Sequence, residues 1–445
     1  MIHRAFSEIL MMRHILLYQL AVLILLTACD KKEILPGKRD EIPGVTTVKD
    51  VESSGKRLAV GTANLTSPTV VSTYIDAAGN KQHNSPNYKV EGLNKLKWKS
   101  SIGRGPVHSN IIAFGDHIYG IDAAGNLVCL SQKDGKKLWQ QHVAPQPDDA
   151  VFMGGLTADN GIIYIATNVG TVLAVDAKTQ KEVWRYNIKC PLHGAPLFVD
   201  GMVIVVSVEN NTFAIDAKTG KVEWSMHASS EQTAMADFGT PAVHHRKVIC
   251  PYTSGELEVY DIRTGLQHWE DTITQSDMSQ SGAAISHIVA SPVVFSTYVL
   301  VATSDSKIAL YDAESGTKIW ECDVGTPNLP IENSGLIFVL SGAGDLVCLS
   351  SKDGSVHWSM NTKKALVNKD TKEENIRVVG PLIVNGDIAV FSNTGSILLV
   401  NATNGKVKTR LTPEVLKNCE IVKIPVIVNG CMYITSARGD IYKIE

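Results

Sequence analysis

FAIDAKTGKVEW, at residues 213–224, is the stretch that decides the fold, because close copies of it recur along the chain. Six further segments align with it without a gap: VCLSQKDGKKLW (128–139), LAVDAKTQKEVW (173–184), EVYDIRTGLQHW (258–269), ALYDAESGTKIW (309–320), VCLSSKDGSVHW (347–358) and LLVNATNGKVKT (398–409). Neighbouring copies begin 38–51 residues apart. Self-similarity at such a period indicates a repeat architecture, in which each copy belongs to one structural unit.

Each copy predicts a strand, a tight turn and a second strand. Phe213 and Ile215 alternate with smaller residues, as in a half-buried strand. Asp216 begins the turn because its carboxylate accepts hydrogen bonds from nearby backbone, and Gly220 supplies a positive φ. Upstream, APLFVDGMVIVVS (195–207) predicts another pair of strands. Four strands in a unit of this length are typical of a β-propeller blade.

The tryptophans mark one position of the repeat. Six of the seven copies end in Trp, whereas the last has Thr409 there. The seventh tryptophan of the chain lies in LKWKSSIG (96–103), which resembles the second half of a copy. We therefore interpret all seven as one structural position, at which a large side chain anchors the outer strand of a blade: Trp98, Trp139, Trp184, Trp224, Trp269, Trp320 and Trp358.

The two ends of the chain predict how the ring closes. The C-terminal GDIYKIE (439–445) supplies a third strand without a Trp strand, and the segment around Trp98 supplies a Trp strand with nothing before it. Together they complete an eighth blade, in which the Trp98 strand pairs with 441–444. We expect one all-β domain at 91–445: an eight-bladed β-propeller of four-stranded antiparallel blades, without exposed edges where the ends meet.

The N-terminal region predicts export and anchoring. Residues 15–28, ILLYQLAVLILLTA, form an uncharged run too short to span a bilayer but suited to a signal peptide at 1–28, which starts at Met1, Met11 or Met12. Leu26-Thr27-Ala28-Cys29 resembles the lipobox of bacterial lipoproteins, in which the cysteine is lipidated. The polar, Pro-interrupted residues that follow predict a flexible tether over 29–90.

The net charge and the repeat pattern limit the functional classes to which the chain can belong. The 445 residues carry a formal net charge of −3, which argues against a nucleic-acid-binding protein built on a basic face. The repeated Asp-Ala-x-Thr/Ser-Gly-x-x-x-Trp pattern resembles that of the pyrroloquinoline-quinone (PQQ) repeat β-propellers. With the lipobox and the short length, the chain is most similar to the BamB family, lipoproteins of the machinery that assembles outer-membrane β-barrels.

An enzyme of the same superfamily is the competing interpretation. The resemblance implies that a quinoprotein dehydrogenase would carry two adjacent cysteines, but no two of the eight cysteines are adjacent. About 43 residues per blade leave little room for loops that build a catalytic pocket. We expect no catalytic, metal or cofactor residues, and core thiols at the seven cysteines after Cys29. The pairs His244-His245 and Asp148-Asp149 are expected to be solvated.

Partners are expected on one face of the ring. The connections between blades vary in length, and the longest span 270–290 and 359–379. Variable loops on a rigid scaffold commonly carry recognition. The BamB resemblance implies binding to BamA and other outer-membrane assembly proteins through Leu192, His193 and Asp237, although His193 stands where the family has Arg.

The resemblance also implies a location. A lipid on Cys29 would hold the chain at the periplasmic side of the cell envelope, in the outer membrane. Asp30 resembles an inner-membrane retention signal, so a scaffold for another envelope complex remains the third interpretation.

Overall fold

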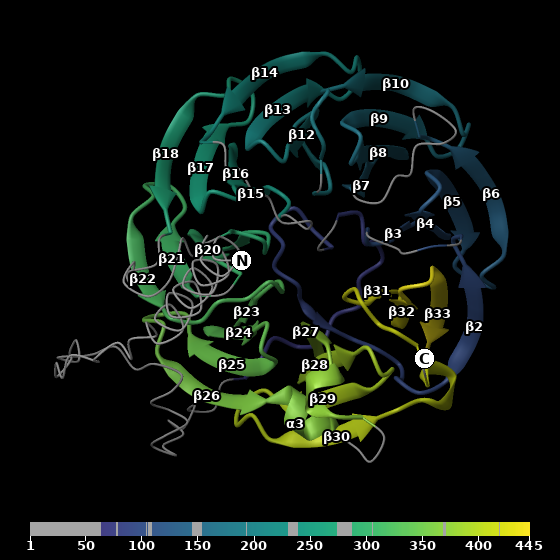
Figure 1. Ribbon diagram of the computed structural model, residues 1–445, viewed down its shortest axis with the longest axis vertical. Helices are drawn as coiled ribbons and strands as arrows, with labels where there is room; N and C mark the ends of the chain where they lie inside the picture. The colour runs from purple at the N-terminus through teal and green to yellow at the C-terminus, as the bar shows by residue number, and fades with distance from the viewer. Residues whose placement is uncertain are drawn as a thin grey trace, which may run out of the picture. The chain divides into compact units, whose positions relative to one another are not determined.

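Eight antiparallel sheets surround a common centre in the computed structural model (Figure 1). The structure describes residues 64–445 except 77–78, 104, 106–108, 145–153, 193, 230–238, 274–286, 305, 368–370 and 418. The signal peptide, Cys29, Asp30, most of the expected tether and Asp148-Asp149 lie outside the described residues. The predicted all-β, eight-bladed propeller is confirmed.

The strands follow one another from the inner to the outer edge of each blade. Blades 1 and 2 contain β3 (Ile112–Phe114), β4 (His117–Ile121), β5 (Asn126–Ser131), β6 (Lys137–His142), β7 (Gly154–Asp159), β8 (Ile162–Thr167), β9 (Thr171–Asp176) and β10 (Glu182–Asn187). Blades 3 and 4 contain β11 (Leu197–Val199), β12 (Met202–Val206), β13 (Asn211–Asp216), β14 (Val222–His227), β15 (Ala242–His244), β16 (Lys247–Pro251), β17 (Glu256–Asp261) and β18 (Gln267–Thr272).

The second half of the ring repeats this order. Blades 5 and 6 contain β19 (Val293–Phe295), β20 (Tyr298–Ala302), β21 (Ile308–Asp312), β22 (Lys318–Cys322), β23 (Ile331–Asn333), β24 (Leu336–Leu340), β25 (Asp345–Ser350) and β26 (Val356–Asn361). Blades 7 and 8 contain β27 (Val378–Val384), β28 (Asp387–Ser392), β29 (Ile397–Asn401), β30 (Val407–Leu411), β31 (Val426–Val428), β32 (Cys431–Thr435), β33 (Asp440–Ile444) and β2 (Leu96–Ser101). β1 (Asn87–Tyr88) adds a fifth, parallel strand to blade 7.

Helical structure in the described residues is confined to short segments. These are α3 (Thr362–Leu366) and the 3-10 turns η1 (Glu373–Asn375) and η2 (Glu414–Leu416). Among the described residues, no helix combines the length and the apolar character that crossing a membrane requires.

Blade 8 closes the ring as predicted. β2 pairs antiparallel with β33, with Trp98 opposite Lys443 and Ser100 opposite Ile441. Figure 1 shows β2, from near the start of the chain, beside the yellow C-terminal β33. Glu445 forms an ion pair with Lys97 of the opposite strand. Segments that are far apart in the sequence, β2 and β33, therefore belong to the same sheet, that of blade 8.

At six of the seven tryptophans, a hydrogen bond from the indole connects its own blade to the next one. The Trp184 indole Nε1 of blade 2 donates to the Ala217 carbonyl oxygen of blade 3 at 2.8 Å. Its ring lies over Gly220, where a Cβ atom would come within 2.7 Å of the Trp184 Cδ2 atom. The same Nε1–carbonyl bond recurs at five other blades: Trp98–Gln132, Trp224–Ile262, Trp269–Ala313, Trp320–Ser351 and Trp358–Ala402. The repeat tryptophan is thus an inter-blade contact, which the sequence pattern alone did not reveal.

The exception at Thr409 has a geometric reason. A tryptophan on β30 would need the turn between the third and fourth strands of blade 8. That turn does not exist, because these two strands come from opposite ends of the chain. Instead, the backbones of Lys95 and Glu445 exchange two hydrogen bonds, of 2.8 and 2.9 Å.

The hydrophobic core lies between blades rather than at the centre of the ring. Of the buried clusters in the described residues, six draw their apolar side chains from two neighbouring blades, and the largest spans blades 6 to 8. Tyr164, Trp184 and Ile215, for example, meet between blades 2 and 3. Stability is therefore distributed around the ring, and each blade depends on its neighbours.

Two glycines allow the inter-blade contact to be tested against backbone strain alone. Gly220 (φ +71°) lies under Trp184, whereas Gly201 (φ +80°) has nothing within 4 Å of an added Cβ. Alanine at either site strains the backbone by about 1–2 kcal/mol. We expect Gly220→Ala to lower the free energy of urea unfolding by about 1–3 kcal/mol more than Gly201→Ala, because only Gly220→Ala also overpacks the indole. Equal losses would contradict the packing role.

Candidate partner-binding face

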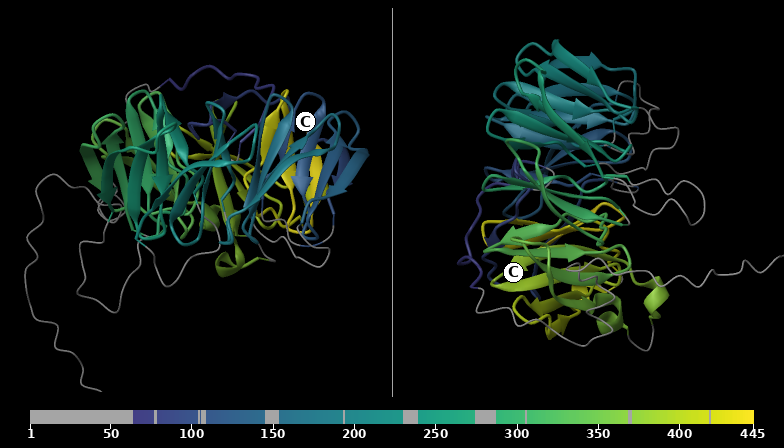
Figure 2. Two further views of the ribbon diagram at one scale, coloured as in Figure 1. Left: turned by 90° about the horizontal axis from the view of Figure 1, so that it is seen from above. Right: turned by 90° about the vertical axis from the view of Figure 1, so that its left-hand side faces the viewer.

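The antiparallel order of the strands gives the propeller two different faces. The turns between first and second strands and between third and fourth strands share one face, the hairpin face. The turns between second and third strands share the other, the connector face, with the connections between blades. Figure 2 shows α3 on the side opposite the purple N-terminal segment. The connections expected to bind partners therefore lie on the connector face.

Of the three residues expected to contact a partner, the structure describes only Leu192. Leu192 is fully buried and packs between blades 2 and 3 with Tyr164 and Val205. Its backbone N–H donates to the Thr167 carbonyl oxygen at 3.2 Å, and Leu192 forms a β-bridge with Ser207. The expectation that Leu192 contacts a partner is therefore corrected: it is a core residue that holds the connection in place. His193 and Asp237 lie outside the described residues.

A hydrogen-bond chain joins the connector face across blades 3, 4 and 5. The Asn210 side chain donates to the Ser229 carbonyl oxygen at 2.7 Å and accepts from the Thr253 hydroxyl at 2.9 Å. The Thr253 carbonyl oxygen lies 2.5 Å from His287 Nδ1. The Ser304 N–H in turn donates to the His287 carbonyl oxygen at 2.9 Å. Ser229 and His287 begin or end connections between blades, so these connections are tied to rigid turns.

One of the two longest connections has regular structure. The segment 359–379, expected as a loop, contains α3 and η1. The Asn361 side chain caps α3 by accepting from the Lys364 N–H at 2.9 Å, and the Thr362 hydroxyl donates to the Gly344 carbonyl oxygen at 2.6 Å. These bonds hold α3 against the blade 6 turn. Most of the other long connection, 270–290, lies outside the described residues.

The hairpin face carries a segment that the sequence placed in the tether. We call residues 64–95 the N-terminal belt. Tyr74 exchanges two 2.7 Å backbone hydrogen bonds with Ala113 of the innermost strand of blade 1, and Tyr88 pairs with the innermost strand of blade 7. His83, Tyr88 and Val90 are buried. The expected tether boundary at residue 90 is therefore corrected: hydrogen bonds join the segment to the propeller at intervals from Thr66 onward.

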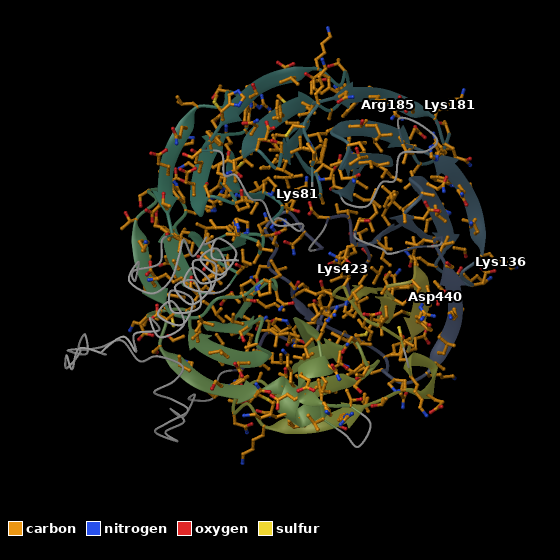
Figure 3. All side chains as sticks on the ribbon, viewed as in Figure 1. Lys81, Lys136, Lys181, Arg185, Lys423 and Asp440 are labelled. Carbon is orange, nitrogen blue, oxygen red and sulfur yellow. The ribbon has the colours of Figure 1, made fainter. Side chains whose placement is uncertain are left out.

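The belt contacts every blade in ring order. Tyr74 meets blade 1 and Ile75 meets blade 2. Lys81 places its ammonium 5.0 Å from the Phe198 ring centroid of blade 3, and Figure 3 shows Lys81 toward the middle of the ring. The remaining contacts join Lys81 to Val243 of blade 4, Gln82 to Val294 of blade 5, Asn84 to Glu332 of blade 6, Tyr88 to Asn385 of blade 7, and Glu91 to Gly430 of blade 8.

The belt also overlaps itself. Thr66 contacts Asn333 of blade 6, so the segment has already passed this blade before Asn84 returns to it. At the crossing, the Thr69 N–H donates to the Asn87 carbonyl oxygen and the Lys89 N–H donates to the Thr69 carbonyl oxygen, both at 2.8 Å. The belt thus makes more than one circuit of the hairpin face and satisfies backbone groups of the innermost strands.

The histidine pair and the cysteines have structural roles. His245 is exposed at φ 52°, but His244 is only 5% exposed, so the expectation of a solvated pair holds for one of the two residues. Burial and the neighbouring His245 lower the pKa of His244, which keeps its ring neutral at pH 7. All seven cysteines of the described residues are free and buried, as predicted, and Cys129 and Cys348 do not pair. Burial raises the pKa of Cys129 to about 11, so its thiol is unreactive at neutral pH.

Comparisons with known proteins agree with this architecture. The family described as "Outer membrane protein assembly factor BamB" matches residues 123–360 and 304–412. The outer membrane protein assembly factor BamB of Yersinia pestis is 21% identical over 370 residues, which cover 80% of this chain and 91% of the relative.

Solved structures share the fold. BamB from Moraxella catarrhalis has a TM-score of 0.66 at 19% identity, covering 79% of this chain and 99% of that one. Quinohemoprotein alcohol dehydrogenase from Comamonas testosteroni has a TM-score of 0.60 at 13% identity, covering 83% and 80%. Identities this low show the fold alone, so they do not separate scaffold from enzyme.

Truncation tests the belt. A chain that begins at residue 64 should keep the thermal midpoint of a chain that begins at Cys29, because both contain the belt. A chain that begins at residue 93 lacks the belt and should therefore unfold several degrees lower. In a domain of 150–250 residues, each kcal/mol lost from the free energy of unfolding lowers Tm by roughly 2–4 °C. Differential scanning calorimetry provides the measurement, and identical midpoints for both truncations would show that the belt adds no stability.

Proposed function

Because the chain belongs to the family of outer membrane protein assembly factor BamB, we propose that it is a non-enzymatic scaffold lipoprotein of the outer-membrane β-barrel assembly complex. In this role it binds BamA and aids the folding and insertion of outer-membrane proteins. The observation that carries the proposal is the family match across more than half of the chain.

The two faces support a division of roles. The belt bonds to the innermost strands on the hairpin face, so that surface is already used within the chain. The connector face carries the connections between blades, fixed at their ends by Asn210, Thr253 and His287. A rigid face with variable connections is suited to binding another protein without reorganisation. We therefore place the BamA contact on the connector face.

His193 and Asp237 remain our candidates for that contact. They belong to neighbouring connections, from blade 2 to blade 3 and from blade 3 to blade 4. Leu192, which directly precedes His193 in the sequence, is buried between these blades and fixes this point of the connection. Substituting Leu192 would open a cavity and destabilise the ring, so it is unsuitable as a probe of binding.

The anchor belongs to the same proposal. A lipid on Cys29 would hold the propeller at the periplasmic side of the outer membrane, close to the barrel-forming subunit. The non-enzymatic part rests on the isolated, buried cysteines and on the belt, which occupies the hairpin-face end of the innermost strands. The shared fold with the Comamonas dehydrogenase supplies no specific observation in favour of catalysis.

Affinity purification from separated inner and outer membranes tests the proposal. The full-length lipidated protein should recover BamA from the outer-membrane fraction. The His193→Ala/Asp237→Ala double variant should recover at least several-fold less, because it removes the proposed contacts. As a matched control, Lys178→Ala/Lys218→Ala changes two exposed residues of the hairpin face and should recover BamA normally.

Three results would contradict parts of the proposal. Equal recovery by both variants would remove His193 and Asp237 from the contact. Recovery of other partners from the inner membrane alone would favour the scaffold suggested by Asp30. A quinone absorption band in the purified protein would favour the dehydrogenase.

A further inference from the structure

Glu258 occupies a position that is apolar in every other copy of the twelve-residue repeat. It is the first residue of EVYDIRTGLQHW, on β17 of blade 4. The equivalent residues of the other copies are Val128, Leu173, Phe213, Ala309, Val347 and Leu398. Those residues pack toward the preceding blade in the inter-blade core. One seam of the ring, between blades 3 and 4, therefore contains a carboxylate where the others contain hydrocarbon.

The carboxylate stands at one end of a chain of hydroxyl groups that reaches from blade 4 to blade 3. Glu258 is only 8% exposed. The Tyr260 hydroxyl donates to its carboxylate. The Tyr252 hydroxyl lies 3.4 Å from the Tyr260 hydroxyl and 2.6 Å from the Thr212 hydroxyl of blade 3. A continuous chain of hydroxyls therefore crosses the seam and ends at Glu258.

The charges around Glu258 disfavour its ionised form. Glu256 lies on the same strand, and Glu270 lies directly opposite on β18. On β16, the residue opposite Glu258 is Cys250, whose pKa burial raises to about 12, so this thiol is neutral. Blade 3 presents the uncharged side chains of Thr212, Trp224 and Met226 to this seam.

The consequence is a carboxyl group that titrates near neutral pH. Burial contributes most, followed by the charges of Glu256 and Glu270, and together they raise the pKa of Glu258 to about 7. In the unfolded chain a glutamate titrates near pH 4.3. Between these two pKa values, Glu258 is protonated in the folded chain but ionised in the unfolded chain. The free energy of unfolding therefore falls as pH rises from about 4 to 7.

The seam also holds one end of a connection on the connector face. The Glu256 carboxylate accepts from the Ser229 N–H at 3.2 Å and from the Ser254 hydroxyl at 2.9 Å. The Ala228 N–H donates to the Asn210 carbonyl oxygen at 3.0 Å. Residues 228 and 229 begin the connection from blade 3 to blade 4 that carries Asp237. A change of charge beside Glu256 therefore acts directly on the base of this connection.

We propose that Glu258 is a proton-controlled switch of the seam between blades 3 and 4. When Glu258 is protonated, the seam is closed and the base of the connection is fixed. When Glu258 is ionised, repulsion from Glu256 and Glu270 loosens the seam and the bonds of residues 228 and 229. The consequence for BamA binding, tighter below neutral pH than above it, rests on the proposed function.

Thermal unfolding of the full mature chain tests the switch itself. We expect the Tm to fall by several degrees between pH 5.5 and pH 8.5. Glu258→Gln and Glu258→Leu should lose most of this fall, the first by removing the charge and the second by restoring the apolar residue of the other repeats. Glu223→Gln, an exposed carboxylate on β14, is the matched control and should keep the full fall. An undiminished fall in both Glu258 variants would overturn the proposal.

Amide hydrogen exchange tests the coupling without any partner. At pH 8.5, residues 228–229 should exchange at least tenfold faster in the parent chain than in Glu258→Gln, because only the parent carries the charge. Equal exchange would overturn the coupling. BamA retention at the two pH values then separates the two proposals: absence of binding in both proteins at both pH values contradicts the proposed function, whereas the unfolding and exchange results still decide the switch.

Discussion

The packing of a tryptophan on the turn of the next blade is the contact on which the ring depends. Burying an indole removes roughly 150–250 Å² from water, or about 4–6 kcal/mol of transfer free energy at 25 cal/mol per Å². At Trp184 this burial is combined with a 2.8 Å hydrogen bond and a glycine that leaves room for the ring. The contact runs in one direction around the propeller, so each blade positions the next. The rigid faces follow from this order.

The point where the ring closes is the place where this contact fails and other interactions replace it. Blade 8 lacks the turn that a tryptophan on β30 would cover, and Thr409 stands there instead. The Lys95–Glu445 backbone pair, the Lys97–Glu445 ion pair and the N-terminal belt all stabilise this region. The belt stabilises the rest of the ring in a similar way, because it contacts each blade in turn. The hairpin face is thereby occupied by the chain itself, whereas the connections between blades lie on the connector face.

Most of the architecture could be predicted from the sequence, because the information lies in side chains that repeat. Trp98 without a preceding strand, and 441–444 without a following one, were enough to predict the closing blade. The belt was not predicted, because most of its hydrogen bonds use backbone groups, one or two per blade. Such bonds leave no periodic pattern in the sequence around Tyr74 or Tyr88. The resemblance predicts a partner contact at Leu192, whereas only the structure shows its side chain packed between blades 2 and 3. Glu258 was visible in the alignment of the repeats, but its burial and its hydrogen bond from Tyr260 are visible only in the structure.

In the proposed function, the connector face meets the barrel-forming subunit while the belt occupies the opposite face. Site-specific photo-crosslinking in intact cells tests this arrangement, with the photoreactive residue placed at position 193 or 237 on the connector face, or at exposed Lys218 on the hairpin face. We expect an adduct with BamA from positions 193 and 237 and none from 218. An adduct from position 218 alone would contradict the assignment of the two faces.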